Sequence, residues 1–224
     1  MDALTYIATK YDLTLSQRQQ PIEIPNTNRE SLARLFFLLE FRKGAEIGVE
    51  RGLYSEVLCK QNPGLQLACV DAWKPYRGYR DHVGGDKLQR FYEETLDRLA
   101  PYPRARTLRK WSVEAAADFQ NGELDFVYID ANHRLEAVIA DLAAWAPKVR
   151  AGGIVAGHDY IRCKLPSLMH VPQAIHAWID AYEIAPLFVL GRKEKNAGEL
   201  RDDGRSWFYV QPAPAPKPEK VIKQ

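Results

Sequence analysis

Two acidic residues and two histidines stand directly after two apolar segments of this sequence. Asp130 and His133 follow the first segment, and His158 and Asp159 follow the second. Carboxylate oxygens are ligands for hard divalent cations such as Mg²⁺. Histidine has an unperturbed pKa of about 6.5 and therefore exchanges protons near neutral pH. Together the four side chains could hold a cation or remove a proton from a substrate, provided that the fold brings the two segments together.

The order of apolar segments along the chain predicts a sheet that does so. We expect strands at 45–49, 65–70, 105–108, 124–129 and 154–156, and helices at 29–41, 54–60, 87–99, 135–145 and 171–182. Two more strand-like runs, 187–190 and 207–210, have no helical pattern between them and should pair antiparallel. The pattern is typical of an α/β fold: a Rossmann-like, doubly wound, mostly parallel sheet of seven strands, the last one antiparallel, with helices on both faces. Ligands of such sheets bind at the carboxyl ends of the strands, where both aspartates would lie.

A glycine-containing turn, Glu46 to Gly52, follows the first of these strands. Gly48 and Gly52 allow the backbone to approach a ligand closely. Asp71 ends the second strand about 20 residues further on, where its carboxylate could accept two hydrogen bonds from the hydroxyls of a ribose. Glu50 stands where a dinucleotide-binding turn has its second glycine, and its charge would repel a pyrophosphate. The turn therefore predicts a nucleoside-bearing cofactor and disfavours a nicotinamide-dependent oxidoreductase.

The segment Glu46-Ile47-Gly48-Val49-Glu50-Arg51-Gly52 resembles the first motif of class I S-adenosylmethionine-dependent methyltransferases. The stretches Asp125 to His133 and Gly152 to Tyr160 are similar to the signature of a bacterial family that includes antibiotic-tailoring O-methyltransferases and cephalosporin hydroxylase-like proteins. The resemblance extends from Ala45 to Tyr160. It implies that Glu46 faces the charged amino-acid end of the cofactor, and that the residues after the third strand line the adenine pocket. The cofactor-binding residues that we predict are Glu46, Gly48, Gly52, Asp71, Ala72, Trp73, Trp111, Ser112 and Asp130.

The same region also resembles catechol-type O-methyltransferases, in which such aspartates bind magnesium and the metal draws the acceptor hydroxyls toward the methyl group. That resemblance implies a metal site at Asp130 and Asp159. It places His133 where those enzymes carry a lysine base, so His133 is our first choice as general base and His158 the second. Those enzymes usually have an amide ligand after the second aspartate, whereas this chain has Tyr160, which leaves metal dependence open.

These residues lead us to expect methyl transfer from S-adenosylmethionine to an oxygen of a small hydroxylated acceptor. The sulfonium is already activated, so positioning the acceptor and removing its proton suffice. Two alternatives remain: a nicotinamide-dependent oxidoreductase, and a non-catalytic binding protein on the same scaffold. Trp111 could stack on the adenine or belong to the core.

The composition of the chain limits the kinds of molecule that we expect it to bind. The 31 basic and 29 acidic residues are interspersed and give a net charge of +2, so nucleic acid is not an expected partner. The three cysteines show no CxxC spacing, which fits a reducing cytoplasm. We find no signal peptide and no segment long enough to cross a membrane. A small-molecule acceptor is expected, and a homo-oligomer stays open.

We expect three parts along the chain. Residues 1–43 form an N-terminal helical segment, 44–211 the methyltransferase domain, and 212–224 a disordered tail rich in proline and lysine. Residues 74–85 combine tyrosines, arginines and paired glycines near the expected mouth of the site, where they could form a lid.

Overall fold

The computed structural model describes residues 2–15, 20–75, 84–161, 169–194 and 196–213. Its α-helices are α1 (Ala3–Lys10), α2 (Arg29–Leu38), α3 (Leu53–Gln61), α4 (Gly85–Leu99), α5 (Ser112–Ala116), α6 (Leu135–Trp145) and α7 (Val171–Ala181). Its strands are β1 (Ile22–Ile24), β2 (Lys43–Ile47), β3 (Gln66–Asp71), β4 (Ala105–Arg109), β5 (Leu124–Ile129), β6 (Val149–Gly157), β7 (Phe188–Leu190) and β8 (Trp207–Val210). Residues 214–224 of the predicted tail, and residues 76–83 of the predicted lid, lie outside the described residues.

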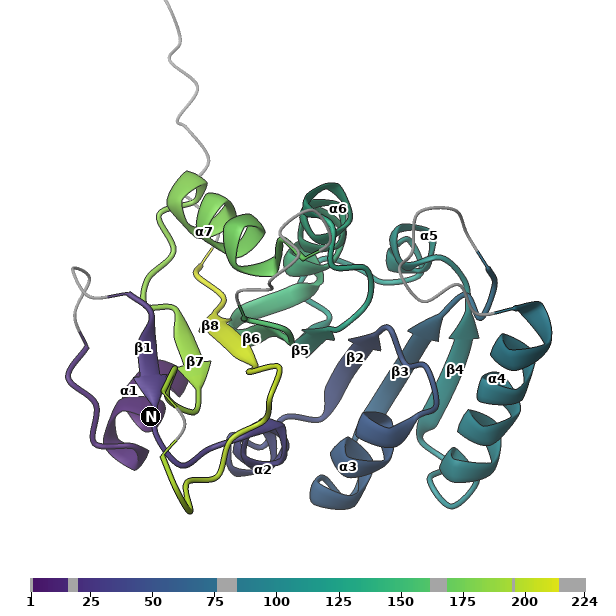
Figure 1. The fold of residues 1–224 in the computed structure, drawn as a ribbon, viewed down its shortest axis with the longest axis horizontal. Helices are drawn as coiled ribbons and strands as arrows, with labels where there is room; N and C mark the ends of the chain where they lie inside the picture. Colours follow the sequence, from purple (N-terminus) through teal and green to yellow (C-terminus); the bar gives the residue numbers. More distant parts are fainter. Residues whose placement is uncertain (1, 16–19, 76–83, 162–168, 195, 214–224) are drawn as a thin grey trace, which may run out of the picture.

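Within this part of the chain the strands form one eight-stranded sheet in the order β1-β7-β8-β6-β5-β2-β3-β4 (Figure 1). β8 runs antiparallel to its neighbours β6 and β7, and the other pairs are parallel. The predicted doubly wound, mostly parallel sheet with an antiparallel last strand is confirmed. The prediction of seven strands was wrong, because β1 pairs with β7 and adds an eighth. Its three residues are too few to show an alternating pattern in the sequence.

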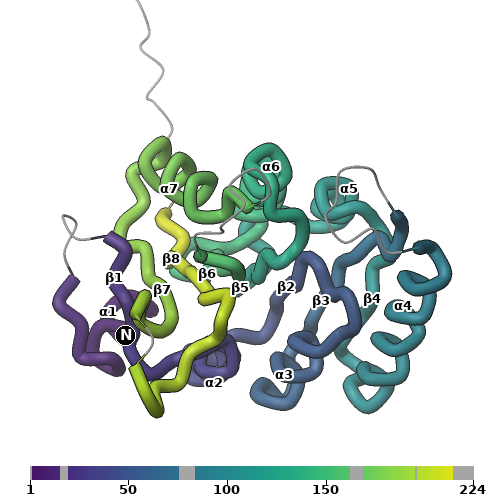
Figure 2. Tube along the Cα trace, in the orientation of Figure 1, coloured from purple at the N-terminus to yellow at the C-terminus, as the bar shows by residue number. Residues whose placement is uncertain are grey.

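Helices cover both faces of the sheet (Figures 1 and 2). On one face, buried residues of α1, α2 and α3 pack against Phe126, Tyr128 and Ile154. On the other, α5, α6 and α7 pack against a second set of strand residues that includes Val127 and Val155. Successive side chains of a strand point to opposite faces of the sheet, so neighbouring residues of β5 and β6 belong to different hydrophobic cores.

The N-terminal packing helix begins as predicted and ends earlier. Asn28 caps α2 by accepting a hydrogen bond from the backbone N–H of Ser31 at 3.0 Å. The helix ends at Leu38, and the chain then reverses at Glu40, whose φ is 57°. Gly44 lies inside β2, where a Cβ would collide with the ring of Phe126. This glycine therefore lets a helix-facing aromatic ring pack directly on the sheet.

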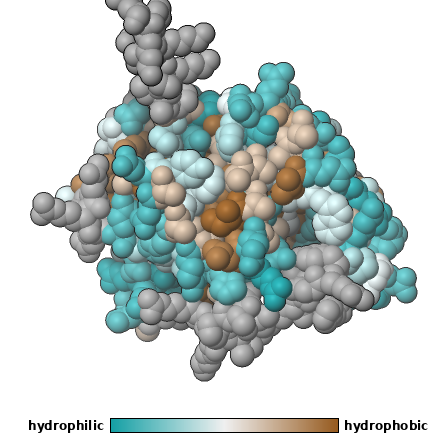
Figure 3. Space-filling model, turned by 90° about the horizontal axis from the view of Figure 1, so that it is seen from above, coloured by the Kyte–Doolittle hydropathy of each residue, from teal (hydrophilic) through white to brown (hydrophobic). Residues whose placement is uncertain are grey.

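The surface over α5, α6 and α7 carries apolar side chains near its centre, surrounded by hydrophilic ones (Figure 3). A shallow depression between α5 and α6 is lined by Val113, Ala116, Ala143 and Pro147, among others. Among the described helices, none is long and apolar enough to cross a membrane.

Candidate active site

The turn after β2 has the tight geometry that its glycines predicted. Gly48 has a φ of 86°, and its N–H donates to the Val70 carbonyl at 2.9 Å. A Cβ at this position would collide with the backbone carbonyl of Asp130 at the end of β5. Gly52 has a φ of 70° and is the N-cap of α3. The turn therefore connects β2 to α3 while lying against the neighbouring strand end.

Asp71 lies at the end of β3 and binds this turn. Its Oδ2 accepts hydrogen bonds from the backbone N–H groups of Val49 and Glu50, both at 3.1 Å, and its Oδ1 accepts one from Trp73 at 2.8 Å. An ionised carboxylate has about four acceptor positions, so a position remains for a ribose hydroxyl. The three observed hydrogen bonds of Asp71 stabilise the conformation of the turn. Contact between Asp71 and the ribose stays a prediction.

Ala72 and Trp73, which we predicted as cofactor-binding residues, lie mostly in the interior. Ala72 is 8% exposed and Trp73 is 2% exposed. The indole N–H of Trp73 donates to the Glu50 carbonyl at 2.8 Å, and its ring packs on Tyr92 with centroids 4.9 Å apart. The Trp73 side chain thus stabilises the turn from the protein interior, and its ring is not accessible to a ligand.

Glu46 lies on β2, two residues before Gly48, and is 2% exposed. Its carboxyl group accepts a hydrogen bond from the hydroxyl of Ser55 on α3. Burial raises the pKa of Glu46 to about 8, although the Ser55 hydrogen bond acts in the opposite direction. A positive group of a ligand would favour the ionised form.

Of the two predicted residues after β4, one is exposed and the other is partly buried. Trp111 is 43% exposed at the N-cap of α5, so it belongs to the protein surface and not to the core. Ser112 donates its hydroxyl to the buried carboxyl group of Asp141 on α6 and accepts a hydrogen bond from the Trp145 indole at 3.0 Å. The sequence analysis did not predict a role for Asp141. This residue could have been noticed as an acidic residue on the apolar side of a predicted helix.

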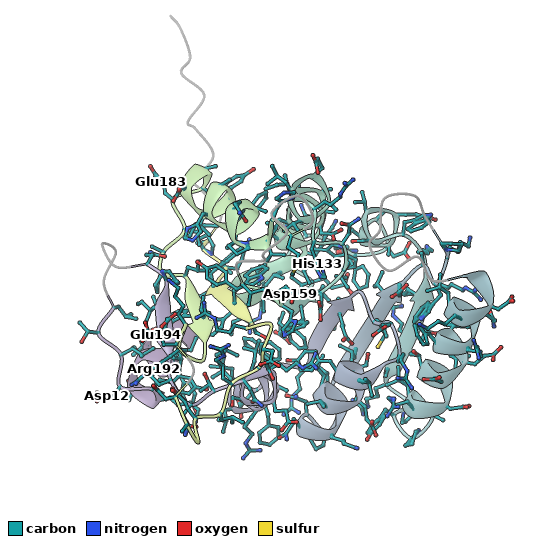
Figure 4. All side chains as sticks on the ribbon, in the orientation of Figure 1. Asp12, His133, Asp159, Glu183, Arg192 and Glu194 are labelled. Carbon is teal, nitrogen blue, oxygen red and sulfur yellow. The ribbon has the colours of Figure 1, made fainter. Side chains whose placement is uncertain are left out.

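Asp130, His133 and Asp159 converge at the carboxyl ends of β5 and β6, as predicted. Figure 4 labels His133 and Asp159, which lie side by side there. His133 Nε2 lies 2.9 Å from Asp159 Oδ2 and 3.8 Å from Asp130 Oδ1. Each residue offers one ligand atom, and these atoms all lie within 4.8 Å of one another. Asp159 has a φ of 58°, which turns its side chain back toward the end of β5.

His158 joins the same group from β6. Its Nδ1 lies 3.7 Å from Asp130 Oδ2 and 3.6 Å from Asp159 Oδ1. Its Nε2 is buried and has no hydrogen-bond partner among the described residues. Gly204 stands so close that a Cβ on it would contact both Asp159 and the His158 ring. The loop before β8 therefore forms one wall of the cluster.

Comparison with known proteins shows the family to which the chain belongs. The model of the family described as "Methyltransferase domain" matches residues 45–160, which is more than half of the chain. The chain belongs to this methyltransferase family. Among curated proteins, none matches the sequence significantly. The family decides against the nicotinamide-dependent oxidoreductase, and it makes S-adenosylmethionine the cofactor.

Solved methyltransferases share the fold at low sequence identity. A Staphylococcus aureus protein assigned as a caffeoyl-CoA O-methyltransferase has a TM-score of 0.58 and 13% identity, over 92% of this chain and 90% of that one. An O-methyltransferase from Bacillus cereus in complex with SAH has a TM-score of 0.57 and 16% identity, over 93% of this chain and 88% of that one. The N-methyltransferase NodS from Bradyrhizobium japonicum has a TM-score of 0.55 and 13% identity, over 82% of this chain and 94% of that one. At these identities the likeness establishes the fold alone.

The charges of this methyltransferase site are strongly coupled. Burial would lower the pKa of His133, but Asp130 and Asp159 outweigh it and raise the pKa to about 10. Burial likewise opposes the charged form of His158, whose pKa the two aspartates nevertheless raise. Burial would raise the pKa of Asp159, yet the two histidines hold it well below its usual range. The two carboxylates thus create a strong preference for positive charge.

The donor set fits a divalent cation. Two carboxylates and one imidazole within reach of one point are common ligands for such ions. Tyr160 takes no part as a ligand: it is 7% exposed, and its hydroxyl is hydrogen-bonded to His176 Nε2 on α7 at 2.7 Å. Tyr160 is therefore a structural residue, and His133 lies where it could supply a third ligand beside the two carboxylates.

The other two histidines that the structure describes have structural surroundings. His170 is the N-cap residue of α7, and its Nδ1 accepts a hydrogen bond from the Leu135 N–H at 3.2 Å. His176 binds Tyr160. His82 lies outside the described residues.

Proposed function

We propose that this methyltransferase transfers a methyl group from S-adenosylmethionine to an oxygen of a small hydroxylated acceptor. The observation that supports this most strongly is the meeting of Asp130, His133 and Asp159 beside the turn after β2. A hydroxyl acceptor must lose a proton during transfer, so it needs a basic group or a cation near the transferred methyl. A free amine acceptor needs far less help, which makes the cluster more useful for oxygen than for nitrogen.

Asp130 and Asp159 are the residues that we propose as cation ligands, with His133 either beside them as a ligand or acting as the base. A divalent cation bound there would lower the pKa of an acceptor hydroxyl and hold it toward the methyl group. His133 can accept a proton only after it has lost its own, and positive charge between the carboxylates favours that loss. His158 contacts the same two carboxylates and is the second candidate for the base.

The cofactor would lie along the ends of β2, β3 and β4. We propose that Glu46 and Asp130 face its amino-acid end, that Gly48 and Gly52 shape the turn beneath it, and that Asp71 accepts its ribose hydroxyls. Trp111 is exposed enough to stack on the adenine. Ser112 would contribute through its backbone, since its hydroxyl is bound to Asp141. The buried free thiols of Cys59 and Cys69 are compatible with a reducing compartment, and a cytoplasmic location stays a prediction.

Calorimetry with the purified protein tests the cofactor. S-adenosylmethionine and S-adenosylhomocysteine should bind and NAD should not, with Mg²⁺ and with a chelator in parallel titrations. Binding of NAD but not of the sulfonium compound and its product would overturn the proposal. Failure of every nucleoside compound to bind would favour the non-catalytic alternative.

Turnover tests the base. With a panel of small phenols and other hydroxylated acceptors, His133→Ala should retain affinity for S-adenosylhomocysteine while losing methyl transfer by roughly 10²-fold or more. The retained affinity serves as the control for folding. Unchanged turnover would remove His133 from the mechanism, and the same measurement on His158→Ala ranks the two histidines.

A further inference from the structure

Arg29, the first residue of α2, holds a positive charge beside the site. Its backbone is fixed at both ends: its N–H donates to Asp202 Oδ2 at 2.7 Å, and its carbonyl accepts from the Tyr54 hydroxyl at 2.9 Å. Its guanidinium carbon lies 5.5 Å from the centre of the Tyr54 ring. The side chain is partly buried, and its guanidinium forms no hydrogen bond or ion pair with any residue that the structure describes. Burial opposes the charged form of Arg29, but nearby groups that include Asp202 and Asp130 outweigh it and raise its pKa. The guanidinium is therefore charged, and its N–H donors are available to the carboxylate of a ligand.

A chain of ring contacts connects Arg29 to the acids of the site. The Tyr54 ring packs on the Tyr128 ring with centroids 4.4 Å apart. Tyr128 is the register partner of Glu46 on the neighbouring strand and comes two residues before Asp130. The charges of Arg29 and Asp130 attract each other, and the charge of Arg29 favours the ionised form of Glu46 against the effect of burial. One unpaired cation therefore stands beside two acids at the carboxyl ends of β2 and β5.

This arrangement matches the charges of an amino acid. The methionine end of S-adenosylmethionine carries an ammonium group and a carboxylate on the same carbon atom. Glu46 and Asp130 complement the ammonium group, but they would repel the carboxylate. A guanidinium presents a planar fork of N–H donors that fits a carboxylate with two parallel hydrogen bonds. The carboxylate thus needs a cation close to the two acids, and Arg29 supplies one.

We propose that Arg29 binds the carboxylate of the methionine moiety of S-adenosylmethionine. The proposal rests on the cofactor site proposed above, with Glu46 and Asp130 at its amino-acid end. It assigns part of the cofactor site to α2, which lies before the segment that matches the methyltransferase family. An acceptor carrying a carboxylate could use the same guanidinium, so the test is made without any acceptor.

The test compares S-adenosylmethionine with its decarboxylated form, which keeps the sulfonium and the amine and lacks only the carboxylate. Calorimetry of the wild-type protein should show preference for the intact cofactor. Arg29→Met should weaken binding of the intact cofactor by roughly 10- to 100-fold, the range expected for one charged hydrogen-bonded pair. Binding of the decarboxylated form should change little, and Arg29→Lys should give an intermediate loss.

Arg34→Met is the matched control, because Arg34 lies on the same helix with an exposed side chain over Phe37. It should bind both compounds as the wild type does. Wild-type affinity of Arg29→Met for the intact cofactor, or an equal loss for both compounds, would overturn the proposal. Thermal unfolding of each variant separates a folding defect from a binding defect, and Arg29→Lys keeps the test valid if Arg29→Met is unstable. If the wild type binds neither compound, the methyltransferase proposal itself fails, which is a different outcome.

Discussion

His133 Nε2 lies 2.9 Å from Asp159 Oδ2, the shortest of the four histidine–carboxylate contacts in the cluster. The two residues follow different strands, so their contact ties the end of β5 to the end of β6. Asp159 and Asp130 together favour the protonated form of the imidazole and raise the pKa of His133 to about 10.

Replacing Asp159 by asparagine should lower the pKa of His133. Neutralising one of its two carboxylate neighbours removes much of the attraction that raises this pKa to about 10. Asparagine suits the position, because it tolerates the positive φ of residue 159. The measurement is an NMR titration of the His133 ring in the presence of a chelator. Glu136→Asn, at an exposed site nearby, is the control, and an identical His133 titration in wild type and Asp159→Asn would contradict the ion pair.

Cation binding to the cluster should release a proton near pH 7.5. Below a pKa of about 10 His133 carries its proton, and a divalent cation between the carboxylates takes the place of that charge. Calorimetry of Mg²⁺ or Mn²⁺ binding in buffers of different ionisation enthalpy counts the protons released. The wild type should release about one proton more than His133→Gln, in which His158 is left as the histidine beside the two carboxylates. An observed enthalpy that does not depend on the buffer would show that His133 keeps its proton.

The meeting of Asp130, His133, His158 and Asp159 could be predicted because each follows a strand directly. Parallel strands place their carboxyl ends at one edge of the sheet, so position along the chain alone determines that such residues are close. The turn at Gly48 was predictable for a similar reason, since few residues other than glycine adopt its φ.

Side-chain direction could not be predicted in the same way. Trp73 follows a strand just as Asp130 does, but its φ of 43° turns the indole into the core. Arg29 belongs to a helix more than a hundred residues before His133, and only the packing of α2 against α3 brings it near Asp130. Asp141 could have been noticed, because it stands between Val138 and Trp145 on the buried side of α6.

Gly48→Ala should cost considerably more stability than Gly64→Ala. Both glycines have a strongly positive φ, 86° and 91°, so both substitutions carry the penalty of about 1–2 kcal/mol for a left-handed residue with a Cβ. At Gly64 the nearest atom to an added Cβ is Arg42 Nη1 at 3.8 Å, whereas at Gly48 the Cβ would collide with the Asp130 backbone. Denaturant unfolding measures the difference, which should be at least about 1 kcal/mol. Equal losses would mean that β5 moves away from the turn freely.

Asp141→Asn should stabilise the protein at pH 7.5 and not at pH 4. Burial raises the pKa of Asp141 from 3.8 to about 6, with the Ser112 hydrogen bond acting against the rise. Between these two values the folded protein binds more protons than the unfolded chain, so stability falls as the pH rises from about 4 to about 6 and is level above it. The loss is on the order of 3 kcal/mol, because each unit of pKa difference corresponds to about 1.4 kcal/mol.

Asparagine is neutral throughout this range, and its side-chain oxygen can still accept the Ser112 hydrogen bond, so the variant should escape the loss. Chemical denaturation of wild type and Asp141→Asn at pH 4, 5, 6 and 7.5 measures the effect. Asp97→Asn, at an exposed site on α4, controls for the substitution itself. A gain in stability that is equally large at pH 4 would place its origin outside the ionisation of Asp141. No gain at pH 7.5 would mean that the buried carboxylate is stabilised by more than the Ser112 hydroxyl.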